Sequence, residues 1–180
     1  MSASPHRKLL NIELARLSPE SFKSAPKAPI AVVLDNIRSA HNVGSVFRSA
    51  DAFRIEEICL CGICATPPSA LIHKSALGAE ETVDWKYFDD TLDALEYLRS
   101  KGYRIACVEQ TQGSIPLPDF TPLKGERYAY VLGNEVDGVQ QHIVDASDFS
   151  IEVPQWGTKH SLNVSVCIGV ILWHFRSRLL

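Results

Sequence analysis

Short apolar segments alternate with helical patterns along most of this chain, and this alternation limits the folds that it can adopt. The first apolar segment, residues 30–34, is a continuous aliphatic run, which is typical of a strand covered on both faces. Further strands are expected at residues 58–61, 83–87, 103–108, 128–132 and 149–153. Helices are expected at residues 43–53, 69–77, 91–101, 139–146 and 162–178. The pattern predicts an α/β fold with a mostly parallel sheet flanked by helices, in which ligands bind at the carboxyl ends of the strands.

The length and composition of the chain are typical of one globular domain. It has 180 residues, of which 46% are hydrophobic and 22% charged, and can bury a substantial core. The first eight residues lack the apolar segment of a secretory signal. The longest apolar run, residues 166–173, is far shorter than the roughly 20 residues that span a bilayer. We therefore expect a cytoplasmic protein that does not cross a membrane.

Charge is distributed unevenly along the chain. Residues 1–28 hold five basic and two acidic residues, a net charge of +3, whereas the remaining 152 residues carry a net charge of −6. Apolar residues recur at helical spacing between residues 7 and 17, so we divide the chain into a basic helical extension, residues 1–28, and a main domain, residues 29–180. The extension either steers a polyanion toward the domain or is a solvated helix face, and both interpretations are open.

Three of the five cysteines, Cys59, Cys61 and Cys64, lie in or next to an expected buried strand. Their spacing lacks the two C-x2-C pairs that are typical of structural zinc sites. A free cysteine in a buried strand behaves as a small hydrophobic residue. We therefore expect free thiols there and no metal.

The segment after the first strand, residues 35–53, carries groups that could bind an anion. Asn42 is predicted as the N-cap of the helix that follows. Arg48 on this helix either forms an exposed ion pair with Asp51 or binds a phosphate through its planar guanidinium, and Arg38 precedes it in the loop. The sequence has neither the glycine-rich dinucleotide pattern nor the P-loop pattern, which argues against those two kinds of site.

Two further segments place polar residues at expected strand ends. One strand ends in Leu132 and Gly133, where a flat ligand could approach the backbone closely, and Glu135 follows. Ser161 and Asn163 lie at the start of the last helix, whose first amide groups attract negative charge. Simpler interpretations are an acidic turn for the first segment, and for the second a cap formed by Ser161 with Asn163 in the first turn.

These segments together resemble the SpoU (TrmH) family of RNA 2′-O-ribose methyltransferases, which belongs to the SPOUT superfamily. Each motif is weak alone, but three in the same order make the match specific. A fourth segment, residues 72–79, also looks like a family segment, and the resemblance covers residues 30–178. The residues that match the three motifs are Asn42, Gly44 and Arg48, then Gly133, Asn134 and Glu135, and finally Pro154 with residues 161–165.

The resemblance implies properties that periodicity could not give. It implies that the C-terminal part of the sheet forms a trefoil knot, that loops of the knot bind S-adenosyl-L-methionine, and that the protein is a homodimer. It also implies transfer of a methyl group from this cofactor to a ribose 2′-hydroxyl of structured RNA, either tRNA or rRNA, without a metal. Two alternatives remain, a non-catalytic RNA-binding protein that retains the fold and a small α/β enzyme with a nucleotide cofactor such as a nicotinamide.

The same resemblance implies roles for individual residues. The cofactor contacts are expected at Leu132, Gly133, Val153, Pro154 and Leu162. The catalytic group is expected to comprise Arg48, Asn42, Glu135, Ser161 and Asn163. The RNA contacts are expected at Arg7, Lys8, Arg16, Arg38 and Arg48. Because the pKa of a guanidinium exceeds 12, Arg48 acts either as a base with the help of a substrate phosphate or as a positioning group.

Overall fold

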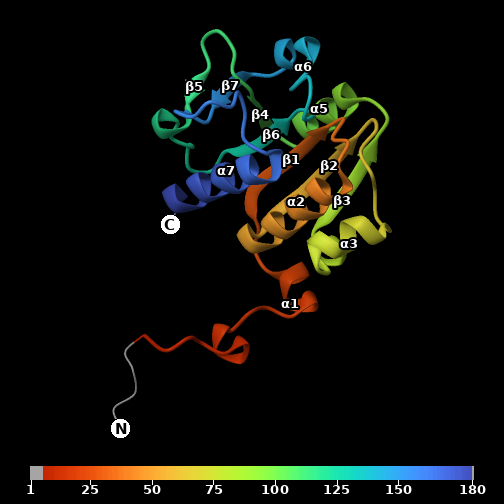
Figure 1. Cartoon of the computed structure of the whole chain (residues 1–180), viewed down its shortest axis with the longest axis vertical. Coiled ribbons are helices and arrows are strands. Elements are labelled where there is room, and N and C mark those ends of the chain that lie inside the picture. The colour runs from red at the N-terminus through yellow and green to blue at the C-terminus, as the bar shows by residue number, and fades with distance from the viewer. Residues whose placement is uncertain (1–5, 180) are drawn as a thin grey trace.

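The computed structural model describes residues 6–179, which form a seven-stranded sheet with helices on both faces (Figure 1). The strand order is β3-β2-β1-β6-β4-β7-β5, and every pair of neighbouring strands is parallel. The predicted α/β fold with a mostly parallel sheet is therefore confirmed. The strands are β1 (Ala28–Asp35), β2 (Ile55–Cys61), β3 (Asp84–Phe88), β4 (Tyr103–Val108), β5 (Ile115–Pro116), β6 (Arg127–Leu132) and β7 (Phe149–Glu152).

The helices pack on both faces because side chains of the central strand alternate between two apolar clusters. Ile30, Val32 and Leu34 of β1 pack with α2, α3, α4 and α7, whereas Ala31 and Val33 pack with α5 and α6. A strand buried on both faces must be apolar at successive positions, which explains the unbroken run in the sequence. The helices are α1 (Pro19–Ser24), α2 (Ala40–Phe53), α3 (Ala70–Ala76), α4 (Ala79–Thr82), α5 (Thr91–Ser100), α6 (Gln141–Asp145) and α7 (Val164–Leu179), with 3-10 turns at Asn11–Leu14 and Leu117–Asp119.

The final helix, α7, is held on the sheet by a cluster of aromatic rings. The ring of Phe175 lies 5.6 Å from that of Tyr128 and 6.3 Å from that of Tyr130, both on β6. The buried Tyr128 hydroxyl donates to Glu126 and accepts from the backbone amide of Leu123, so its burial leaves no unpaired polar group. Although α7 is apolar, no helix within residues 6–179 is both long and apolar enough to cross a membrane.

Most predicted elements are present, but their ends are shifted. β2 begins at Ile55 rather than at residue 58, and α6 is confined to residues 141–145. α2 begins at Ala40 and α7 at Val164, so both helix starts differ from the predicted ones. The two-residue strand β5, which the sequence did not indicate, pairs with β7. The helix starts matter for the site, because they decide which polar residue caps each helix.

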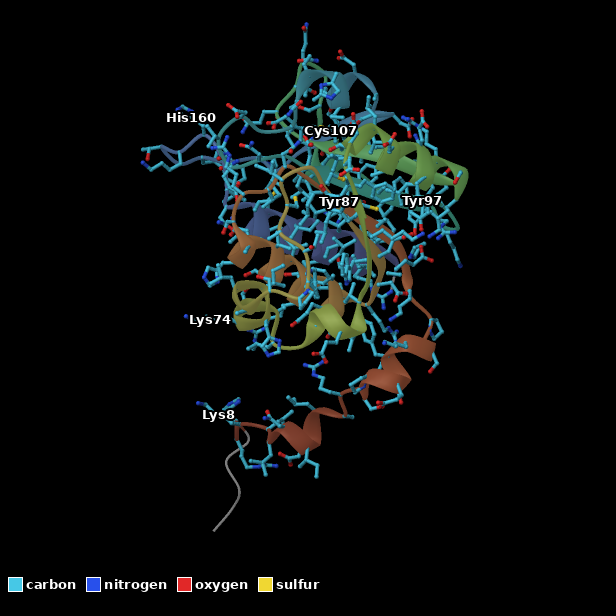
Figure 2. All side chains as sticks on the ribbon, turned by 90° about the vertical axis from the view of Figure 1, so that its right-hand side faces the viewer. Lys8, Lys74, Tyr87, Tyr97, Cys107 and His160 are labelled. Atoms are coloured by element: carbon cyan, nitrogen blue, oxygen red, sulfur yellow. The ribbon has the colours of Figure 1, made fainter. Side chains whose placement is uncertain are left out.

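The segment before α1 does not form the helix predicted over residues 7–17. Only Asn11–Leu14 form a 3-10 turn, and none of these four residues is buried. Leu10 and Ile12 are 63% and 89% exposed, so the apolar stripe has no core against which to pack. Short helices without tertiary contacts are marginal in water, which accounts for the wrong prediction. The segment extends away from the domain, with Lys8 near its far end (Figures 1 and 2).

The short helix α1 attaches this segment to the domain. Ser18 caps α1 as predicted, because its hydroxyl accepts from the backbone amide of Ser21 at 3.2 Å. Phe22 on α1 is 5% exposed and belongs to the larger apolar cluster. β1 then begins at Ala28, but the division of the chain into an extension and a catalytic domain stays a prediction.

The cysteines are free, as the sequence predicted. Burial raises the pKa of Cys59 to about 12 and that of Cys64 to about 11, so both remain protonated. The Cys64 thiol donates to the carbonyl oxygen of Leu34 at 3.2 Å and accepts from the backbone amide of Ile37 at 3.1 Å. Cys64 thereby fixes the loop that follows β1. A protonated thiol is also a poor metal ligand.

Candidate active site

Three loops at the carboxyl edge of the sheet meet at the side chain of Asn42. Its amide nitrogen donates to Glu135 Oε1 at 2.8 Å, and its amide oxygen accepts from Asn163 Nδ2 at 3.1 Å. Asn42 follows β1, Glu135 follows β6 and Asn163 follows β7. One residue from each of the three sequence motifs therefore joins a single hydrogen-bonded group, which we call the Asn42 junction.

Asn42 can serve this junction because it is not the N-cap of α2, contrary to the prediction. Ser39 is the N-cap, and its hydroxyl accepts from the backbone amide of Asn42 at 3.3 Å. Asn42 therefore lies in the first turn of α2, where its side chain is free to reach across to other loops. Serine and asparagine are both good N-caps, so the sequence did not distinguish them.

Gly44 of the first motif allows a close helix–helix contact. A Cβ atom at this position would lie 2.2 Å from Ser75 Oγ and 2.4 Å from the carbonyl oxygen of Ile72, both on α3. Backbone atoms cannot move aside cheaply, so only glycine fits here. The contact fixes the helix that carries Asn42 and Arg48.

Glu135 is held by groups of the loop between β1 and α2. Besides the Asn42 amide, its carboxylate accepts from the backbone amides of Arg38 at 3.2 Å and Ser39 at 3.4 Å. Partial burial works to raise the pKa of Glu135, but these hydrogen bonds outweigh it and hold the pKa below the ordinary value of 4.5. Glu135 is therefore ionised at neutral pH and links the second motif to the first.

Replacement of Glu135 by glutamine is expected to reduce the loss of thermal stability that the protein shows at acid pH. The lowered pKa means that the ionised carboxylate stabilises the folded protein above the unfolded-state pKa, and that this contribution is lost as the pH falls through the folded-state pKa. Thermal unfolding between about pH 6 and pH 3 should show a smaller loss for Glu135→Gln than for the wild type. Asp137→Asn, which removes one carboxylate from the same exposed loop, is the matched control. Identical slopes for Glu135→Gln and the wild type would contradict this expectation.

Gly133 is required for a further reason that the sequence did not indicate. A Cβ atom there would lie 2.0 Å from the backbone carbon of Gly138 and 2.1 Å from the backbone nitrogen of Val139. The space that a Cβ atom of Gly133 would occupy is therefore filled by the end of the loop that follows. In this loop, the backbone amides and carbonyls of Asn134 and Gly138 are hydrogen-bonded to each other. Gly133 closes this loop tightly as well as lying beside the pocket described below.

Asn163 caps α7, so the simpler interpretation of Ser161 as the cap is wrong. The side-chain oxygen of Asn163 accepts from the backbone amide of Ser165 at 2.9 Å and from the Ser165 hydroxyl at 2.6 Å. The amide nitrogen of Asn163 takes no part in the cap and donates to the side-chain oxygen of Asn42. Ser161 is exposed and lies two residues before the cap, where its hydroxyl is available to a ligand.

A cavity of about 1290 Å³ adjoins the Asn42 junction. The loops that follow β4, β6 and β7 form its walls. Four of the five predicted cofactor residues line it, and Pro154 does not. Glu135, Ser161 and Asn163 also line it, whereas Asn42 and Arg48 lie outside the lining. The predicted cofactor residues in the wall are Leu132, Gly133, Val153 and Leu162.

One wall of the cavity was missed by the sequence reasoning. Glu109 and Gln110 follow β4 and line the cavity. Glu109 accepts from the backbone amide of Val139 at 3.0 Å, and Gln110 Nε2 donates to the carbonyl oxygen of His160 at 2.7 Å. His160 lies on the segment after β7 that projects from the domain (Figure 2). The available signal was the position of residues 109–110 directly after a predicted strand.

Arg48 is exposed on α2 and does not form the ion pair with Asp51 that was its simpler interpretation. Asp51 instead accepts from the Thr82 hydroxyl at 2.8 Å. Within residues 6–179 the guanidinium of Arg48 has no hydrogen-bonding or ion-pair partner, and the same is true of Arg38. Two arginines near the Asn42 junction are therefore available to an anionic ligand.

The basic residues of the N-terminal segment are not equally available. Arg7 forms a bidentate ion pair with Glu13, at 2.7 and 3.0 Å. Lys8 and Arg16 are exposed, and within the described part of the chain their side chains have no such partner. Of the three predicted RNA contacts in this segment, Arg7 is therefore the one that must exchange an existing partner.

A parallel sheet with a large cavity built from the loops at its carboxyl edge defines an α/β ligand-binding domain. The chain belongs to the SpoU rRNA Methylase family, whose model matches residues 29–173. This match confirms the family that the three motifs indicated.

Known relatives support this assignment, and a solved structure shares the fold. The chain is 30% identical over 155 residues to the 23S rRNA (guanosine-2'-O-)-methyltransferase RlmB of Neisseria meningitidis serogroup B, which is 84% of this chain and 59% of that protein. It is 33% identical over 148 residues to RlmB of Nitrosomonas europaea, covering 80% of this chain and 54% of that protein. The chain thus spans little more than half the length of these relatives. An AdoMet-bound rRNA methyltransferase from Sinorhizobium meliloti shares the fold, with a TM-score of 0.79 and 24% identity over 92% of this chain and 62% of that one.

Proposed function

We propose that the protein transfers a methyl group from S-adenosyl-L-methionine to a ribose 2′-hydroxyl of structured RNA, either tRNA or rRNA. The observation that carries this proposal is the Asn42 junction, which joins the three family motifs beside a cavity large enough for the cofactor. Family membership and the activity for which the two RlmB relatives are named support the same reaction.

The cavity suits a cofactor that has an apolar ring and a positive charge. Leu132, Val153 and Leu162 offer an apolar surface to an adenine, and Gly133 offers backbone. Glu109 and Glu152 also line the cavity and favour a cation over an anion. When bound there, S-adenosyl-L-methionine would supply an electrophilic methyl group on its sulfonium. Pro154 does not line the cavity, and its predicted contact with the cofactor stays a prediction.

The residues around the cavity would position the ribose and assist its deprotonation. For this transfer, the ribose 2′-hydroxyl would have to lose its proton to an acceptor as its oxygen takes up the methyl group. Arg48 binds a phosphate of the substrate and brings that phosphate, a proton acceptor, close to the hydroxyl. The Asn42 junction keeps the start of α2 aligned with the cavity, and the exposed Ser161 hydroxyl contacts the ribose. Positioning of this kind supplies much of the rate enhancement in a two-substrate reaction.

We further propose the trefoil knot and the homodimer that the resemblance implies. The segment between β7 and α7 lies against the loop after β4, through the bond from Gln110 to His160, which supports a knotted path. Val166, Val170 and Trp173 are 53%, 39% and 61% exposed on the outer side of α7 and offer an apolar surface to a second copy. The cytoplasmic location stays a prediction.

The proposal is tested by methyl transfer from labelled S-adenosyl-L-methionine to total tRNA and, separately, to rRNA, both from a strain that lacks this protein. Label recovered as a 2′-O-methylated nucleoside in one pool would support the reaction and select the RNA class. Absence of label in both pools, with RNA binding retained, would favour the alternative of a non-catalytic RNA-binding protein.

The basic N-terminal segment is expected to contribute to RNA affinity. A triple substitution of Arg7, Lys8 and Arg16 by alanine should weaken binding and reduce the slope of log affinity against log salt by about 2, because fewer phosphates are neutralised. The matched control replaces Leu9, Leu10 and Ile12 by serine, which alters the same exposed segment without changing its charge. Both variants keep α1 and its buried Phe22. An unchanged salt slope in the alanine variant would exclude these residues from the RNA contact.

A further inference from the structure

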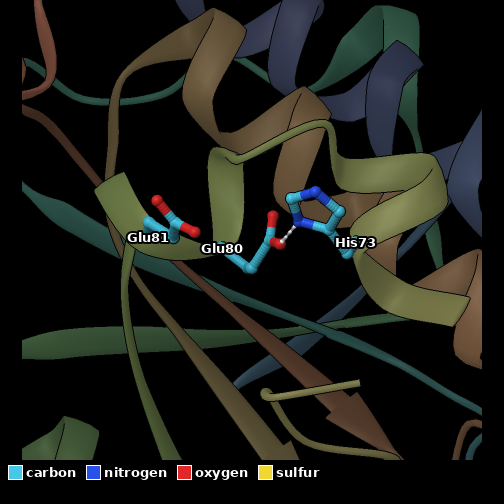
Figure 3. A group of neighbouring side chains, drawn as sticks. All are labelled: His73, Glu80 and Glu81. Atoms are coloured by element: carbon cyan, nitrogen blue, oxygen red, sulfur yellow. Dashed lines mark hydrogen bonds and ion pairs between the residues drawn. The ribbon is translucent and has the colours of Figure 1, made fainter. Parts of the chain in front are cut away.

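A cluster of possible metal ligands lies on α3 and α4, in a part of the fold that the proposed reaction does not use. His73 on α3 faces Glu80 on α4, and Glu81 lies next to Glu80 on the side away from His73 (Figure 3). His73 Nδ1 lies 2.5 Å from Glu80 Oε1, and one ligand atom from each of the three residues falls within 4.8 Å of the others. A separate cavity of about 400 Å³ opens onto all three side chains. In the sequence only the cysteines were candidate metal ligands, so this group was not expected from it.

A second observation is an unpaired oxygen atom on Glu80. The side chain of Glu80 is only 8% exposed, and its Oε2 atom is buried without any hydrogen-bond partner in the structure. Leaving a buried carboxylate oxygen unsatisfied costs free energy, because water cannot reach it and no donor replaces water. Glu80 already uses its other oxygen for His73. A positive ion held between Glu80 and its two neighbours would satisfy the free oxygen.

We propose that His73, Glu80 and Glu81 bind one divalent transition-metal ion, with zinc as the best match. One imidazole and two carboxylates form a ligand set that suits zinc, and the two carboxylate charges balance the ion. Zinc holds nitrogen and oxygen ligands at about 2.0–2.2 Å, so two ligand atoms on one ion lie about 3–4 Å apart. His73 and Glu81 are exposed and can rotate to reach this spacing around the buried Glu80. Solvent fills the remaining coordination position.

The ion would fasten two short helices that support the active-site helix. α4 has four residues and α3 has seven, so neither is stable without external contacts. Ser75 on α3 donates to the carbonyl oxygen of His41 at 3.0 Å, and Gly44 of α2 packs directly on α3. The metal therefore stabilises the support of α2 and takes no part in the chemistry. The inference depends on this geometry alone and stands whether or not the protein methylates RNA.

The test is zinc titration of the metal-free full-length protein, followed by calorimetry and by thermal unfolding. We expect one equivalent of zinc to bind, and the melting temperature to rise by about 5–10 °C at a hundredfold excess over Kd. His73→Ala and Glu81→Gln should each weaken zinc binding at least tenfold. Both side chains are exposed, and Glu81→Gln also keeps the bond between His73 and Glu80, so it tests the site without unpairing the buried carboxylate. His142→Ala, which removes another exposed histidine, is the matched control and should bind zinc as the wild type does.

Cobalt substitution identifies the ligands independently of activity. Nitrogen and oxygen ligands give weak visible bands, whereas thiolate ligands add an intense near-ultraviolet charge-transfer band. We expect the weak bands alone, and expect them to disappear in His73→Ala. Absence of saturable zinc uptake, zinc binding that persists unchanged in His73→Ala and Glu81→Gln, or a thiolate band would each overturn the proposal.

Discussion

Replacement of Arg48 by alanine is expected to lower the rate of methyl transfer by at least about 100-fold, the scale on which positioned proton transfer acts. Arg48 is exposed on a rigid helix, and its guanidinium has no partner within residues 6–179, so the substitution removes a ligand contact and no structural one. Arg48 also lies outside the lining of the cofactor cavity. The affinity for S-adenosyl-L-methionine should therefore remain within about twofold of the wild-type value. Single-turnover rates and cofactor titration measure the two quantities separately.

Arg48→Lys provides the graded comparison for this experiment. Lysine keeps the positive charge but cannot bind a phosphate in the planar, bidentate manner of arginine. We expect Arg48→Lys to bind RNA better than Arg48→Ala and yet to remain slow in methyl transfer. Wild-type turnover in Arg48→Ala would show that Arg48 is not part of the active site. Wild-type turnover in Arg48→Lys alone would show that only the positive charge of Arg48 is needed.

The sheet could be predicted from the sequence because its central strands are buried on both faces. Residues 30–34 and 128–132 have to be apolar throughout to pack against helices on each side, and that requirement is visible without a structure. The N-terminal stripe shows the limit of the method. Periodicity over residues 7–17 indicates a helix only if a core is present to receive its apolar face, and the structure offers none there.

The site could be predicted only as three separate segments. Asn42 and Glu135 are 93 residues apart in the sequence, and Asn42 and Asn163 are 121 residues apart, so their contacts depend on the strand order. Local rules also assigned the wrong caps. Ser39 with Asn42, and Ser161 with Asn163, are pairs of equally good capping residues, and packing of the helix decides which one is used. The family resemblance indicated that the three segments form one site, which rules about neighbouring residues could not show.

Replacement of Asn42 by aspartate is expected to disrupt the Asn42 junction and to reduce methyl transfer at neutral pH by about 100-fold, the cost of displacing a positioning group by about 1 Å. The change removes the donor to Glu135 and sets a second carboxylate against it. Glu135 is held ionised at this pH by its backbone donors, so the two like charges repel. The start of α2, which carries Arg48, should then move away from the loop after β6. Rates of methyl transfer and the melting temperature measure the two consequences.

The pH dependence separates this repulsion from a simple loss of one hydrogen bond. As the pH falls, the two facing carboxyls of Asn42→Asp take up one proton between them, and the shared proton restores a donor. The ratio of variant to wild-type activity should therefore rise as the pH falls from about 8 to about 5.5. Asn163→Asp is the matched comparison, because it also loses a donor within the Asn42 junction, but its charge lies at the start of α7, where the helix dipole and the cap favour it. That variant should lose less activity and show no such recovery. If both variants behaved alike at every pH, the charge of Glu135 would not be what holds the start of α2 in place.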